Sequence, residues 1–86
     1  MRAKVRGRQY VMTSHAEEEM DADGLSIFDI ENAVLTGSIV ERQVDRAKGE
    51  RKYVIRGSPL EGDDAVVVVA KTGPTGKVVI LTVYSE

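Results

Sequence analysis

The chain has 86 residues, of which 42% are hydrophobic and 30% are charged, and its formal net charge is −2. This length predicts one domain, and the composition is typical of a folded globular protein. The absence of cysteine excludes disulfide bonds and cysteine-ligated zinc. The longest apolar run, residues 65–70, is too short to cross a bilayer, and no apolar stretch of signal-peptide length follows the basic N-terminus. We therefore expect a small cytoplasmic protein of bacterial type with no membrane partner.

The charges are segregated along the chain. Residues 2–8 carry four bases and no acid, whereas residues 17–31 carry seven acids and no base. A second basic group follows between residues 42 and 56. Such blocks either form one basic and one acidic face or are solvated surfaces without a partner.

The first third of the chain predicts a strand and a short helix. Residues 1–8 have the composition of a flexible basic arm, which leads into a strand over residues 9–13. Ser14 and Glu17 have the spacing of a capping box and predict the start of a helix. Gly24 ends this helix, because glycine adopts a left-handed conformation without penalty.

A second helix follows directly. It begins at Ser26, which forms another capping box with Asp29, and it ends at Gly37. The spacing of its apolar residues predicts a buried stripe made of Ile27, Ile30, Ala33 and Val34.

Four strands complete the chain. Residues 39–44 and 52–56 predict a partly exposed hairpin. Residues 65–70 and 78–84 are apolar on both faces, which is typical of central strands that are covered on each side or shielded by a homodimer. This order predicts an α+β fold in which two short helices pack on a four- to five-stranded antiparallel sheet, with residues 9–86 as a single domain.

Several short motifs follow one another in an order that is specific when they are taken together. The first comprises Thr13, His15, Ala16, Met20, Gly24, Leu25 and Ser26. The later ones comprise Gly37 and Ile39, then Arg51, Tyr53, Ile55 and Gly57, then Ile80, Thr82, Val83 and Tyr84. From about residue 9 to residue 85 the chain thereby resembles the bacterial family known as domain of unknown function 4258.

The resemblance implies a layout similar to that of small toxins of the RelE and BrnT type, which pack helices on a curved antiparallel sheet and cleave RNA. It implies a metal-independent endoribonuclease or RNA-binding protein without a cofactor, paired with an antitoxin protein. The chain departs from the family pattern in the first helix, where two arginines of the family fall on Glu19 and Asp23. A ribonuclease needs cations at the scissile phosphate, and acids beside His15 repel that phosphate.

His15 is the only histidine and the first candidate catalytic residue. Histidine suits acid–base catalysis at neutral pH. The alternative is a structural residue at the start of a helix, hydrogen-bonded to a neighbouring strand. No second histidine and no cysteine are present, so we predict no metal site.

Arg51 and Tyr84 complete the set of candidates. Strand alternation places Lys52 and Arg56 on one face of their strand and Arg51 on the other. The guanidinium of Arg51 can clamp a phosphate or carboxylate, or its charge can discourage unwanted strand pairing. Tyr84 either places its hydroxyl near a site or stacks on the sheet.

Two functions of different classes stay open. The first is a toxin-like RNA-binding protein or endoribonuclease, with His15 as acid–base group, Arg51 as phosphate clamp and Tyr84 as orienting residue. The second is a non-catalytic module on the same scaffold that binds a protein through the acidic helix face or the hairpin edge. The basic arm and the motif positions favour the first, whereas the acidic helix and the net negative charge favour the second.

Overall fold

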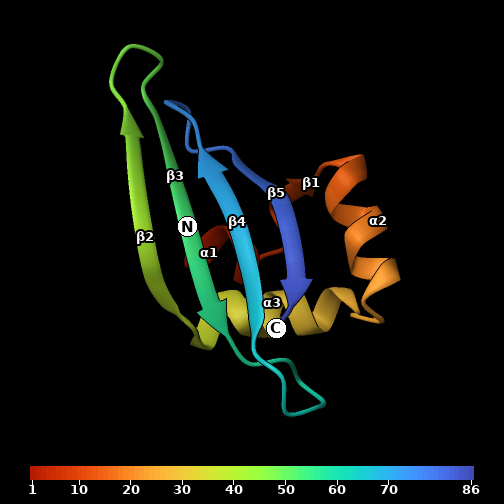
Figure 1. Cartoon of the computed structure of the whole chain (residues 1–86). Helices are drawn as coiled ribbons and strands as arrows, with labels where there is room; N and C mark the ends of the chain where they lie inside the picture. Colours follow the sequence, from red (N-terminus) through yellow and green to blue (C-terminus); the bar gives the residue numbers. More distant parts are fainter.

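The computed structural model describes residues 1–86, which form three helices and one five-stranded sheet (Figure 1). The helices are α1 (Arg2–Arg6), α2 (Ser14–Ala22) and α3 (Ile27–Thr36). The strands are β1 (Tyr10–Met12), β2 (Ser38–Asp45), β3 (Glu50–Gly57), β4 (Val66–Thr72) and β5 (Val78–Ser85). The predicted α+β class is confirmed. None of the helices is long and apolar enough to cross a membrane.

The strand order in the sheet is β1-β5-β4-β3-β2, so β4 and β5 are internal, as their apolar sequences predicted. The pairs β2–β3, β3–β4 and β4–β5 are antiparallel, but β1 runs parallel to β5, with Tyr10 opposite Val78 and Met12 opposite Ile80. The prediction of a purely antiparallel sheet is therefore wrong. Strands β1 and β5 lie near opposite ends of the sequence, so the path of the intervening elements sets their relative direction.

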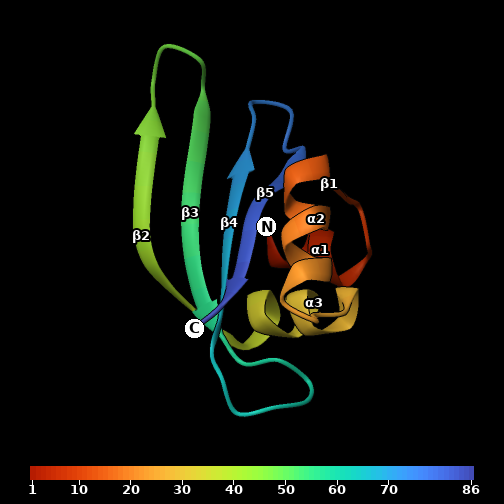
Figure 2. The same cartoon turned by 45° about the vertical axis from the view of Figure 1, so that its right-hand side comes forward.

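The helices form a layer on one side of the sheet, and the other face carries no such layer (Figure 2). The core between the layers is made of Val5, Ala16, Ile30, Ala33, Val34, Ile55, Val66, Val68, Ala70, Ile80 and Val83. The predicted stripe of α3 is buried except for Ile27, which is half-buried. Alternate side chains of β3 and β4 thus pack against the helices, and the bulge at Leu81 in β5 lets both Ile80 and Val83 face them as well.

Helix α1 occupies the segment that we predicted to be a flexible basic arm. Val5 is only 1% exposed and belongs to the core. Arg2 donates from Nε to the carbonyl of Val34 (3.2 Å) and from Nη2 to the carbonyl of Gly37 (2.7 Å). These bonds satisfy acceptors at the C-terminal end of α3, where a cation is also favoured by the helix dipole. The prediction of a flexible arm is wrong, because one buried valine and this cap hold the segment in place.

Helix α2 is capped one residue earlier than predicted. Thr13 is the N-cap, and its Oγ1 accepts the N–H of Ala16 at 3.1 Å. The same hydroxyl donates to the carbonyl of Leu81 at 3.2 Å, which ties the start of α2 to β5. The predicted capping box of Ser14 and Glu17 is therefore not the cap of this helix, because tertiary contact with β5 favours Thr13.

The turn into α3 and the start of that helix follow the prediction. Gly24 has φ = +67°, the left-handed conformation that ends a helix. Ser26 Oγ accepts the N–H of Asp29, and the Asp29 carboxylate accepts the N–H of Ser26 at 2.9 Å. This reciprocal arrangement is the capping box expected from the sequence.

Two glycines allow α3 to approach the sheet closely. A Cβ atom on Gly57 would overlap the carbonyl oxygen of Ala33 and would lie 2.8 Å from its Cα atom. A Cβ atom on Gly37 would meet the same carbonyl. The missing side chains therefore position the end of β3 and the start of β2 directly against α3.

The face of the sheet without helices is shielded by its own long side chains. Val67 is only 4% exposed there, although no helix lies over it. Its neighbours in the two strand pairs are Arg56 of β3 and Tyr84 of β5, and Arg56 forms an ion pair with Glu86. The aliphatic part of Arg56 and the ring of Tyr84 are well placed to cover the valine.

Candidate functional site

His15 lies in the first turn of α2 and points into solvent. Its side chain is 67% exposed, and its Nε2 atom is 3.2 Å from Oε1 of Glu19, one helical turn further along. It lines none of the clefts of the molecule. An exposed pair of this kind contributes little to stability and forms no enclosed site for acid–base catalysis.

The other two candidate residues lie on opposite faces of the sheet. Arg51 shares the helix-side face of β3 with the buried Ile55, because side chains four residues apart on a strand point the same way. Tyr84 is opposite Val67, on the face without helices, and is 42% exposed. The structure therefore does not bring His15, Arg51 and Tyr84 into one site.

The acids at the family's arginine positions have a structural role. Strand β1 ends at Met12, so the outer edge of β5 has no strand partner beyond that point. The Glu19 carboxylate accepts the N–H of Val83 (3.3 Å), and the Asp23 carboxylate accepts the N–H of Ser85 (2.8 Å). Two carboxylates at α2 thus provide acceptors for the backbone N–H groups of β5 that β1 does not reach. Arginine has no acceptor and could not make these bonds.

The largest concave surface lies between α1 and the adjoining ends of the two hairpins. A cleft of about 570 Å³ and a second one of about 290 Å³ share Met1 and Tyr53 in their linings. All charged side chains that line these clefts are basic, namely Arg2, Lys4, Arg42 and Arg51. We call this surface, formed by the four bases with Met1 and Tyr53, the basic groove.

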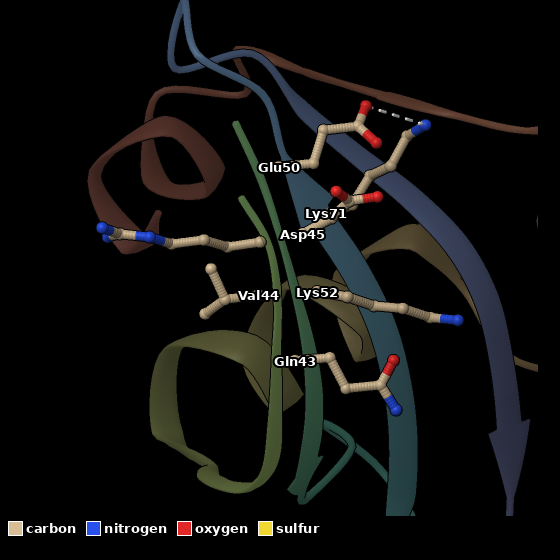
Figure 3. Close-up of a pocket in the computed structure, with 7 residues that line it drawn as sticks. Gln43, Val44, Asp45, Glu50, Lys52 and Lys71 are labelled. Carbon is tan, nitrogen blue, oxygen red and sulfur yellow. Dashed lines mark ion pairs between the residues drawn. The ribbon is translucent and has the colours of Figure 1, made fainter. Parts of the chain in front are cut away.

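The acids of the β2–β3 hairpin point away from the basic groove. Figure 3 shows Val44 on one side of the hairpin and, on the other side, Gln43, Asp45, Glu50, Lys52 and Lys71. Glu50 forms an ion pair with Lys71 of β4 at 3.6 Å on that other side. Alternation places Arg42 and Arg51 on the side of Val44, toward the helices. The acids of these two strands therefore lie on the face opposite the basic groove, together with Lys52.

None of the four bases of the groove has a carboxylate partner, and three of them also donate no hydrogen bond to the protein, whereas Arg2 donates to the carbonyls of Val34 and Gly37. Lys4, Arg42 and Arg51 are exposed and form no ion pair. The guanidinium of Arg42 lies 5.6 Å from the centre of the Tyr53 ring, which orients it by a cation–π contact. Unpaired cations that line a cleft concentrate positive potential there even when the net charge is negative. This arrangement can bind phosphate or carboxylate groups.

Acids gather at the opposite end of the strands, beside the loop that follows β3. A cleft of about 160 Å³ there is lined by carboxylates that include Asp23, Asp29, Glu61, Asp63 and Asp64. Hydrogen bonds from Ser26, and further ones from the N–H groups of Leu60 and Glu61, hold the pKa of Asp29 below its ordinary value despite its burial. No group of three or more histidine, aspartate or glutamate side chains is placed to hold a metal ion. Asp29 instead anchors the loop to α3.

Glu31 of α3 is a buried carboxylate that the sequence analysis did not single out. The Tyr10 hydroxyl donates to its Oε2 atom at 2.6 Å, and Arg8 Nε lies 3.7 Å from the same atom. Burial first, and then the bond to Glu31 and its charge, raise the pKa of Tyr10 well above its ordinary value. Arg8 also lies over the ring of Phe28 at 5.1 Å. These contacts join β1 to α3, and Glu31 lines no cleft.

Comparison with known proteins gives one assignment. The family model described as "Domain of unknown function (DUF4258)" matches residues 12–85. The chain belongs to this family. No curated protein and no solved structure matches the chain, so the likeness to toxins of the RelE and BrnT type stays a prediction.

The DUF4258 region supplies only part of the basic groove. Arg42, Arg51 and Tyr53 lie within the matched residues, whereas Lys4 belongs to α1, which precedes them. The sequence analysis singled out Arg51 but not its neighbours in the groove. Hairpin alternation carries a signal for Arg42, because it places Arg42 on the same face as Arg51. The block of four bases in residues 2–8 includes Lys4, but only the docking of α1 brings Lys4 to the groove.

Proposed function

We propose that this member of the DUF4258 family binds single-stranded RNA through the basic groove. The observation that supports the proposal is the presence of three unpaired bases, and no acid, in the largest clefts of a chain whose net charge is −2. Backbone phosphates supply most of the affinity in RNA binding, and lysine and arginine are their usual partners. The charge pattern of the groove matches that requirement.

The shape of the groove favours a single strand. Its concave lining lies between α1 and the hairpin ends, where a flexible strand can turn phosphates toward Lys4 and Arg51. The Arg42 guanidinium, stacked on Tyr53, offers a flat cationic surface for a base. A duplex holds its phosphates on a rigid convex surface, which fits such a concave cleft less well.

We propose that the protein binds RNA without cleaving it, because of where His15 lies. Cleavage needs an acid–base group within hydrogen-bond reach of the reacting hydroxyl. His15 does not line the groove, and the Glu19 carboxylate lies beside it. The endoribonuclease activity implied by the family resemblance stays a prediction that the same RNA preparations can test, and the antitoxin partner stays a prediction.

The experiment compares two neighbouring cations of β3. Arg51→Ala removes a base from the groove, whereas Lys52→Ala removes an exposed, unpaired base from the opposite face of the same strand. We expect Arg51→Ala to weaken binding of a short fluorescent RNA of mixed sequence by about tenfold, because charge-assisted bidentate bonds are lost. Lys52→Ala and His15→Ala should bind as the parent does. Equal losses for Arg51→Ala and Lys52→Ala, or no RNA binding at low salt, would refute the proposal.

A further inference from the structure

The two edges of the sheet differ in whether the outward backbone N–H groups of the edge have an acceptor. At the β1 edge, α2 lies alongside β5, and Glu19 and Asp23 accept the N–H groups of Val83 and Ser85. At the β2 edge no helix, loop or side chain accepts the outward backbone N–H groups. An unpaired strand edge is a template for pairing with another chain, and folded proteins usually cover or interrupt it.

Strand β2 is long and open. All eight of its residues are exposed, and three of the large exposed hydrophobic side chains of the molecule belong to it: Ile39 (39%), Val40 (59%) and Val44 (54%). In Figure 2 the β2–β3 hairpin extends away from the helices, so no other element covers its outer edge. The bulge at Val40 interrupts the register with β3, and the regular part of the edge runs from Glu41 to Asp45.

The charges of β2 disfavour pairing with a second copy of the chain. In an antiparallel self-pairing centred on residue 41 or residue 42, Glu41 or Arg42 would face its own copy. In the pairing centred on residue 43, Glu41 would face Asp45. Like charges directly opposite each other destabilise a strand pair. The edge therefore fits a strand of different sequence better than itself.

We propose that the outer edge of β2 binds an extended segment of a partner protein, which adds to the sheet as an antiparallel strand along Glu41–Asp45. Glu41 and Asp45 point to the face without helices, form no ion pair and are exposed. The segment carries lysine or arginine opposite both of these acids. It carries an acid opposite Arg42 and an apolar side chain opposite Val44 on the other face.

This surface is distinct from the RNA proposal in most of its residues. The backbone edge and the acids Glu41 and Asp45 lie outside the basic groove, and Lys4 and Arg51 lie away from the outer edge. Arg42 is common to both surfaces, so it is left unchanged in the test. Failure of one proposal therefore leaves the other standing.

The probe is a synthetic peptide, Thr-Lys-Val-Thr-Glu-Lys-Thr, added to isotopically labelled full-length protein and followed by amide NMR shifts. We expect saturable shifts concentrated in residues 38–45 and in their partners on β3. The peptide with methylated backbone nitrogens, which cannot donate to a strand edge, should give none. The folded double variant E41K/D45K, checked by its unperturbed spectrum elsewhere, should lose about tenfold in affinity. It should instead prefer the peptide in which the two lysines are replaced by glutamate.

Shifts that cluster elsewhere would overturn the proposal, as would equal binding by the methylated peptide or an absence of shifts at millimolar peptide. The thermal midpoint of E41K/D45K, compared with that of the parent, provides an independent check on folding. A variant that keeps the parent's midpoint but has lost the peptide confirms that the peptide site is the β2 edge.

Discussion

Asp29 joins helix α3 to the loop between β3 and β4, and its replacement by alanine removes four hydrogen bonds at once. Its carboxylate accepts from the backbone N–H and the hydroxyl of Ser26 and from the N–H groups of Leu60 and Glu61. Loss of the half of the capping box that the Asp29 carboxylate supplies costs about 1 kcal/mol, while the N–H of residue 29 still donates to the N-cap Ser26. The bond from Leu60, at 2.9 Å to a charged acceptor, is worth about 1.5 kcal/mol, and the longer one from Glu61 adds little.

The free energy of unfolding of Asp29→Ala should therefore fall by about 2–3 kcal/mol. For a chain of this size that loss lowers the midpoint of thermal unfolding by about 10–20 °C, measured by circular dichroism at neutral pH. Asp63→Ala is the control, because Asp63 is exposed in the same loop and makes no hydrogen bond. A midpoint for Asp29→Ala that matches that of Asp63→Ala would refute the assignment of these bonds.

The pH dependence gives a second test of the same residue. The pKa of Asp29 in the folded state is lower than its ordinary value of 3.8. The stabilisation by the ionised carboxylate is therefore complete above the pKa of the unfolded state, about 4, and is lost as the pH falls through the folded-state pKa. The stabilities of the parent and of Asp29→Ala should converge in strong acid. A difference that stays constant down to strong acid would show that ionisation of Asp29 is not the cause.

Two further predictions concern packing and the edge of the sheet. Gly57→Ala should lower the free energy of unfolding by about 2 kcal/mol or more, because the new methyl group overlaps the backbone of Ala33. Gly73→Ala, where a Cβ meets nothing within 4 Å, should change it little in the same urea titration. Glu19→Ala should cost about 1–2 kcal/mol, because an N–H group of β5 loses its acceptor, whereas Glu18→Ala on the exposed side of α2 should be nearly neutral. Equal effects of the two glutamate changes would contradict the structural role given to Glu19.

Much of the fold follows from local sequence. The capping box of Ser26 and Asp29 and the glycine at position 24 set the limits of the helices through interactions within a few residues. Strands β4 and β5 are central because their apolar runs need cover from neighbours on both edges. These signals act over short distances and are therefore readable in one sequence.

The errors came from contacts between distant segments. Helix α1 is mostly polar, and it is held in place by the buried Val5, by Met1 at its start and by the bonds of Arg2 to the end of α3. The N-cap of α2 is Thr13 and not the predicted Ser14, because the Thr13 hydroxyl also donates a hydrogen bond to β5. The parallel pairing of β1 likewise depends on the whole chain path. Nothing within these segments shows where the partner segment lies.

The candidate site was predictable only in part. Alternation correctly placed Arg51 on the face opposite Lys52, but the helix that completes the groove beside it could not be foreseen. The motif around His15 drew attention to an exposed residue that lines no cleft. The acids beside it were expected to repel phosphate, and the Glu19 carboxylate accepts the N–H of Val83 at the edge of β5. The short motifs indicate the family, whereas the proposal of RNA binding rests on the charge pattern of the groove.

The salt dependence of RNA binding tests the central claim most directly. If Lys4, Arg42 and Arg51 each neutralise one phosphate, the logarithm of the association constant should fall against the logarithm of salt concentration with a slope of about −2. For Arg51→Ala the slope should be about −1.4, and for Lys52→Ala it should stay at the value of the parent. An Arg51→Ala slope equal to that of the parent, or a flatter slope for Lys52→Ala, would show that RNA does not bind in the basic groove.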